Sequence, residues 1–124
     1  MEIGTIQASD REVELKHPVT EEGLGLFFSL RSPYSDEVKK AEREWLNARL
    51  AKKKQSITAE ALEAAKEKQI MAAVSGWRFE GDANIGGEKP KFNPAALREL
   101  IRKHVWIRQF LDEELGDTAG FFQA

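Results

Sequence analysis

The side chains that most often carry catalysis or bind metals are few in this sequence. It contains two histidines, His17 and His104, and no cysteine. A zinc site or a Ser–His pair would require one histidine to meet carboxylates or hydroxyls from distant parts of the chain, and no His-x-x-x-His spacing supports either. His104 is interpreted as a half-buried histidine of a helix. We therefore predict no catalytic residue and no metal site.

A glycine-rich segment, residues 80–92, is the second place where chemistry could occur, because glycine lets backbone amides approach a ligand closely. A phosphate-binding loop requires a lysine followed by Ser or Thr at the start of a helix, whereas Gly87 precedes Glu-Lys-Pro. Asp82, Asn84 and Gly87 match a calcium loop, but its twelfth position, normally a bidentate glutamate, is Asn93. We interpret the segment as an ordered connector and predict no cofactor.

An acidic run at residues 112–114 could supply acid–base catalysis only if one carboxylate were held in an apolar pocket. On a helix surface near lysines and arginines, these carboxylates are expected to be solvated instead. The sequence therefore predicts a protein that is not an enzyme.

The aromatic residues are more informative than the polar ones. Three tryptophans and seven phenylalanines are spread over the predicted helical units. Most should lie in the core, but a domain of 124 residues cannot easily bury them all. Exposed apolar surface bordered by charge is typical of protein-binding sites. The candidate partner-binding residues are Phe27, Trp77, Phe92, Trp106, Ile107, Phe110, Phe121 and Phe122.

The fold that must position these residues is predicted to be α+β and mainly α. Apolar and charged residues alternate over residues 12–17, and a second alternating segment covers residues 24–31, which together predict an antiparallel β-hairpin near the N-terminus. An isolated hairpin is only marginally stable, so we expect one of its faces to pack on helices.

Two helices are predicted after the hairpin, at about residues 35–54 and 58–77. Both carry apolar residues at helical spacing, and the short link between them predicts an antiparallel pair. Ser35 and Thr58 are interpreted as the residues that cap their first turns.

Two further helices are predicted at about residues 94–104 and 105–115. Asn93 is a favourable N-cap, and the proline after it suits the first position of a helix. The apolar stripe changes phase in the middle of this region, which predicts a kink or break between Lys103 and Trp106.

A single domain is expected over residues 1–124, with flexible ends at about 1–10 and 117–124, the second of them either loose or docked. The formal net charge of −2 lacks the basic excess of most nucleic-acid-binding proteins. No apolar stretch approaches the roughly 20 residues that cross a bilayer, and the N-terminus lacks the pattern of a secretory signal. We therefore expect a soluble cytoplasmic protein that does not enter membranes.

Six short stretches together resemble the tail assembly chaperones of long-tailed bacteriophages, which are encoded just before the tape measure protein. They include a His-Pro-Val-Thr turn, a Ser-Pro before a charged helix, a Gly-Trp, a Phe-Asn helix cap, a Trp-Ile-Arg segment and a terminal Phe-Phe. One departure is Val105, where the family often has proline. The stretches are residues 15–20, 24–37, 76–77, 92–94, 105–109 and 121–122.

The resemblance implies a non-enzymatic phage or prophage chaperone in the cytoplasm of the bacterial host. Relatives of this kind bind the tape measure protein and, through a longer frameshifted product, the tail tube protein. A tape measure is long and apolar, so repeated copies that also contact each other would cover it, and we expect self-association. The alternative is a small helical regulatory nucleic-acid-binding protein. It would use the basic residues Arg98, Arg102, Lys103 and Arg108.

Overall fold

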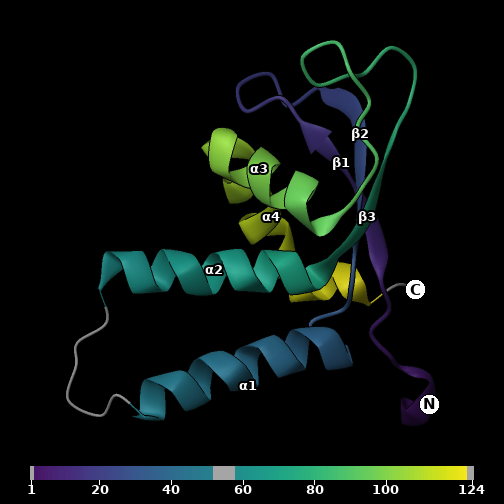
Figure 1. Cartoon of the computed structure of the whole chain (residues 1–124). Coiled ribbons are helices and arrows are strands. Elements are labelled where there is room, and N and C mark those ends of the chain that lie inside the picture. The colour runs from purple at the N-terminus through teal and green to yellow at the C-terminus, as the bar shows by residue number, and fades with distance from the viewer. Residues whose placement is uncertain (1, 52–57, 123–124) are drawn as a thin grey trace.

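The computed structural model describes residues 2–51 and 58–122 and has an α+β architecture that is mainly α, as predicted (Figure 1). In these residues, a three-stranded antiparallel sheet with strand order β1-β2-β3 is combined with four α-helices and two short 3₁₀ helices. The elements are η1 (Ile3–Thr5), β1 (Arg11–Lys16), β2 (Gly23–Leu30), α1 (Asp36–Ala51), α2 (Ala59–Ala73), β3 (Val74–Phe79), α3 (Pro94–Lys103), α4 (Val105–Gly116) and η2 (Thr118–Phe121).

The predicted N-terminal hairpin is confirmed, with β1 and β2 pairing antiparallel. His17 organises the turn between them. Its Nδ1 accepts hydrogen bonds from the backbone N–H groups of Val19 (3.1 Å) and Thr20 (3.2 Å). A side chain that accepts from the following amides is a common way to close a turn, so the His-Pro-Val-Thr sequence has a structural role.

The prediction of one helix over residues 58–77 is wrong at its C-terminal end. Helix α2 stops at Ala73, and the chain passes directly into β3, a strand that the sequence analysis did not predict. β3 pairs antiparallel with β2, so that Phe28 lies opposite Trp77. Ser and Gly at positions 75 and 76 are poor helix formers, whereas the surrounding valine and aromatic residues favour strands. Hydrogen bonding to β2 therefore outweighs the helical spacing of the apolar residues.

The helices cover one face of the sheet and leave the other face open (Figure 1). Alternate residues of the strands point toward the helices, as the period-two pattern requires. The core forms where these side chains meet α2, α3 and α4. It contains Val13, Leu15, Leu26, Phe28, Leu30, Ile70, Val74, Leu97, Leu100, Ile101, Ile107, Leu111 and Phe121.

Helices α1 and α2 form the predicted pair, which extends away from the sheet (Figure 1). Thr58 caps α2 as expected, because its Oγ1 accepts from the N–H of Ala61 at 3.0 Å. α1 packs mainly against α2 and buries Val38 and Ala41. The predicted continuation of the first helix to residue 54 lies outside the described residues.

The predicted break between the last two helices is confirmed at His104, which has φ −122° and ψ 83°. Asn93 is the N-cap of α3, and its side chain accepts from the N–H of Ala96 at 2.8 Å. The break redirects the chain, so that Leu97 of α3 and Leu111 of α4 both face the core.

The C-terminal segment is docked on the body, which is one of the two expected arrangements. Phe121 is fully buried, and its carbonyl oxygen accepts from the N–H of Ser9 at 2.8 Å. The guanidinium of Arg11 lies 4.8 Å from the centroid of the Phe121 ring and forms a 2.7 Å ion pair with Glu114. These contacts hold η2 against the start of β1.

Candidate partner-binding cleft

A cleft of about 590 Å³ lies between one end of the sheet, the loop 80–93 and the helices α3 and α4. The floor of the cleft is formed by strand residues on the helix-facing side of the sheet. This part of the sheet extends beyond the helices that cover the rest of that face. Apolar side chains form most of its surface, and charged residues are placed at its margin. Its apolar side chains include Leu15, Leu24, Leu26, Trp77, Phe79, Ile85, Leu100, Trp106 and Ile107.

Trp77 connects the sheet to the loop that forms one wall of the cleft. Its Nε1–H donates to the carbonyl oxygen of Pro90 at 2.9 Å. Its ring packs edge-on against Phe92, with 5.1 Å between centroids and an interplanar angle of 89°. It also contacts Phe28 and Phe79 at centroid distances of 6.3 and 6.4 Å. Edge-to-face contacts of this kind are favourable, so Trp77 fixes the position of the wall.

The loop 80–93 is held by a hydrogen bond to β2 and by hydrogen bonds between its own residues. The N–H of Glu80 donates to the carbonyl oxygen of Gly25 at 2.7 Å. Gly25 has a φ of 81°, and a Cβ there would lie 2.9 Å from the Glu80 carbonyl oxygen, so a larger residue would clash. Further along, Asn84 Oδ1 accepts from the N–H of Gly87 at 2.8 Å. The loop therefore forms a defined wall of the cleft.

The residues considered for calcium are used within the loop. Asn84 bonds Gly87, as described above, and also donates from Nδ2 to the carbonyl oxygen of Asp82 at 2.9 Å. Lys89 donates to the carbonyl oxygen of Gly81 at 2.7 Å. Among residues 2–51 and 58–122, no group of three or more His, Asp or Glu side chains is arranged to hold a metal ion.

The opposite wall is formed by α3 and α4. Trp106 is half-buried there, and the buried Ile107 borders the cleft beside it. Glu99, Lys103 and His104 lie along the margin of this wall. An apolar floor with a charged margin is the usual composition of a protein-binding site.

No protein-family model, curated protein or solved structure matches this chain. Within the part of the chain that the structure describes, no helix has the length and apolar character needed to cross a membrane. A functional assignment therefore depends on the cleft and on the residues that form it.

Of the eight candidate residues, Trp77, Trp106 and Ile107 line the cleft. Phe92 does not line the cleft but packs on Trp77, which does. Phe110 is half-buried against the core outside the cleft. The structure thus brings together candidate residues from β3, the loop 80–93 and α4, although they are separated in the sequence.

The remaining candidates lie elsewhere. Phe27 is on the open face of the sheet, with the guanidinium of Arg78 lying 4.1 Å from its ring centroid. Phe122 is 40% exposed and contacts Tyr34 at a centroid distance of 6.1 Å. The interpretation of Phe121 as a surface residue is wrong, because docking of the C-terminal segment buries its ring completely.

Several cleft residues were missed from the sequence. Leu24 is 38% exposed and has the same parity along β2 as the buried Leu26, so it lies on the helix-facing side where the helices end. Ile85 is an isolated apolar residue in a polar loop. Strand parity was a usable signal for Leu24, whereas the position of Ile85 depends on how the loop folds back.

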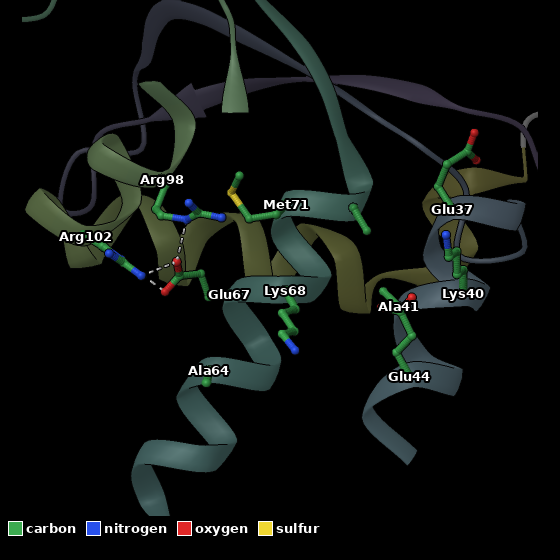
Figure 2. A pocket seen from close by; sticks show the side chains of 11 residues that line it. Glu37, Lys40, Ala41, Glu44, Ala64, Glu67, Lys68, Met71, Arg98 and Arg102 are labelled. Atoms are coloured by element: carbon green, nitrogen blue, oxygen red, sulfur yellow. Dashed lines mark hydrogen bonds and ion pairs between the residues drawn. The ribbon is translucent and has the colours of Figure 1, made fainter. Parts of the chain in front are cut away.

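A second cleft, of about 540 Å³, lies between α1, α2 and α3 and is lined largely by charged residues (Figure 2). Glu67 of α2 accepts from two arginines of α3, Arg98 at 3.3 Å and Arg102 at 2.9 Å. Within α3, Lys103 pairs with Glu99 at 3.4 Å. These acids reduce the positive potential of the basic cluster on which the nucleic-acid alternative depends.

Over residues 2–51 and 58–122, two carboxylates have clearly shifted pKa values, and neither lines the apolar cleft. Burial raises the pKa of Asp112, and the positive charges of Lys66 and Arg108 partly offset this. A hydrogen bond from Arg78 lowers the pKa of Glu12, which lies on the open face of the sheet. These shifts reflect local packing and pairing.

Proposed function

We propose that this protein is a bacteriophage or prophage tail assembly chaperone that acts by binding other proteins and has no enzymatic activity. The observation that carries the proposal is the apolar cleft. Three stretches that resemble the chaperone family meet there, because Trp77 and Trp106 line the cleft and Phe92 packs on Trp77.

The proposed client is the tape measure protein, with the tail tube protein as a second partner through an extended product. Burying one large apolar side chain contributes about 1.5–3 kcal/mol. One or two such side chains per cleft would give modest affinity for each copy. Many copies along a long client would nevertheless keep it from aggregating. The proposed location is the cytoplasm of the bacterial host, where tails assemble.

The proposal is tested by co-expressing the chain with fragments of the tape measure protein encoded downstream. We expect the wild-type chain to raise the soluble fraction of the fragments and to co-purify with them. The variant Leu24→Lys places a charge in the cleft at a partly exposed position and should abolish both effects. Ile3→Lys is the matched control, because Ile3 is exposed and does not line the cleft. Equal capture by Leu24→Lys and wild type would refute the assignment.

The nucleic-acid alternative gives a different result in a simple titration. Glu67 offsets one of the two positive charges of Arg98 and Arg102, and Glu99 offsets that of Lys103, so these three cations and two acids carry a net charge of only +1. We expect no binding to duplex DNA or RNA at low salt, where phosphate contacts are strongest. Tight, salt-dependent binding would instead favour the alternative.

A further inference from the structure

A stripe of leucines on α1 is exposed to solvent. Leu46 is 50% exposed and Leu50 is 58% exposed. They are four residues apart, so they lie on the same face of the helix one turn from each other. Both lie in the second half of α1, whereas the buried residues of this helix, Val38 and Ala41, lie in its first half. We call Leu46 and Leu50 the leucine stripe.

The leucine stripe cannot reach the cleft of its own chain. α1 packs mainly against α2, and the pair projects away from the sheet and from the loop 80–93 (Figure 1). One molecule therefore carries the leucine stripe at one end and the apolar cleft at the other. Since the two cannot meet within one chain, both the stripe and the cleft can contact a partner.

The charges beside the two surfaces are complementary. The charged residues three or four positions from Leu46 are Glu42, Arg43 and Arg49, and Lys39 lies one turn before Arg43 on the same side of the helix, so cations outnumber the single acid beside the leucines. Among the described residues, Lys39, Arg43 and Arg49 form no ion pair within 4.0 Å. The margin of the cleft carries the carboxylates of Glu88 and Glu99. Lys103, the cation at that margin, pairs with Glu99, so Glu88 leaves a net negative charge.

We propose that the leucine stripe of one copy docks in the cleft of a second copy, with Arg43 and Arg49 beside the acids of its margin. The two surfaces are different, so the interface is head-to-tail, and each added copy leaves a free stripe and a free cleft. Such an interface produces rings or open chains. This inference shares the cleft with the proposed function but does not depend on the identity of the client.

The test combines two defective variants and measures molar mass by light scattering after gel filtration. Wild type is expected to show a mass that rises with concentration. Leu46→Lys with Leu50→Lys removes the stripe, Leu24→Lys blocks the cleft, and each should weaken self-association on the order of tenfold or more. Ile3→Lys should behave as wild type. Circular dichroism of each variant confirms folding, which is expected because the altered side chains are exposed or partly exposed.

Mixing the two variants gives the decisive result. The stripe variant retains a cleft and the cleft variant retains a stripe, so an equal mixture should form dimers that cannot grow further. A monomeric wild type, a mixture that stays monomeric, or dimers of the cleft variant alone would each overturn the proposal.

Client capture by the stripe variant separates this inference from the proposed function. Its cleft is intact, so it should bind tape measure fragments at least as well as wild type. Retained capture together with a monomeric wild type would refute head-to-tail docking alone. Failure of the wild type to capture the fragments, together with self-association that Leu24→Lys weakens, would support docking and exclude only the named client.

Discussion

Trp77 of β3 and Pro90 of the following loop are joined by a 2.9 Å hydrogen bond from the indole Nε1–H to the proline carbonyl oxygen. This bond links a strand of the sheet to the wall of the apolar cleft across thirteen residues of chain. The aromatic contact with Phe92 lies beside it. The shape of the cleft therefore depends on Trp77, whose backbone is part of the sheet and whose side chain holds the loop.

Trp77→Phe tests this link. The variant keeps an aromatic ring and loses the donor, so the free energy of unfolding should fall by about 1 kcal/mol from the lost hydrogen bond, with some further loss from the smaller ring. Amide hydrogen exchange should increase in loop 80–93 more than in β1. Unchanged exchange in the loop would show that Phe92 alone is sufficient to hold it.

Trp106→Ala separates binding from stability. The Trp106 ring is half-buried, so its removal should cost about 2 kcal/mol, less than the 3–5 kcal/mol typical of a fully buried aromatic residue. Capture of tape measure fragments should weaken more than the loss of stability explains. Denaturant melts and pull-down assays at a temperature where the variant is fully folded provide the two measurements.

The adjacent residues Phe121 and Phe122 provide a matched pair. Phe121 is fully buried, and Phe121→Ala should lower the free energy of unfolding by about 3–5 kcal/mol. Phe122 is 40% exposed, and Phe122→Ala should change it by less than about 1 kcal/mol. Chemical denaturation of both variants gives the comparison. Similar losses in the two would mean that the C-terminal segment is not docked in solution.

Asp112 predicts a specific pH dependence. Its pKa is raised from an ordinary value of 3.8, chiefly because burial disfavours the charged carboxylate. Between the unfolded and folded pKa values the folded state binds more protons, so this group reduces stability as pH rises through that window. Asp112→Asn should therefore stabilise the protein at neutral pH and have less effect at pH values below the ordinary one. Urea denaturation over a pH series would measure the difference, and a uniform effect at every pH would contradict it.

The sequence was most informative where structure is set by neighbouring residues. Thr58 and Asn93 were recognised as caps because the bonds they form are to amides three residues away. The break at His104 followed from a change of phase in the apolar stripe. β3 could not be distinguished from a continuation of α2, because its stability depends on pairing with β2, more than forty residues earlier in the sequence.

The same distinction applies to the cleft. Trp77 and Trp106 were predicted as binding residues from their type, but the sequence did not show that they face one space. Phe121 was misplaced because its burial depends on a distant partner, Arg11, and on the backbone of Ser9. Residue type indicated which side chains are apolar enough to bind a partner, and tertiary contacts decided which of them remain accessible.

The direct passage of α2 into β3 has a mechanical consequence. Arg31 clamps this junction, because its N–H donates to the carbonyl oxygen of Ala73 and its guanidinium to that of Ala72, both at 2.7 Å. No residue separates the end of α2 at Ala73 from the start of β3 at Val74, so the two elements are joined without a loop. Because Trp77 lies on the same strand, we expect a displacement of α2 to shift β3 and, with it, the position of the Trp77 side chain in the cleft.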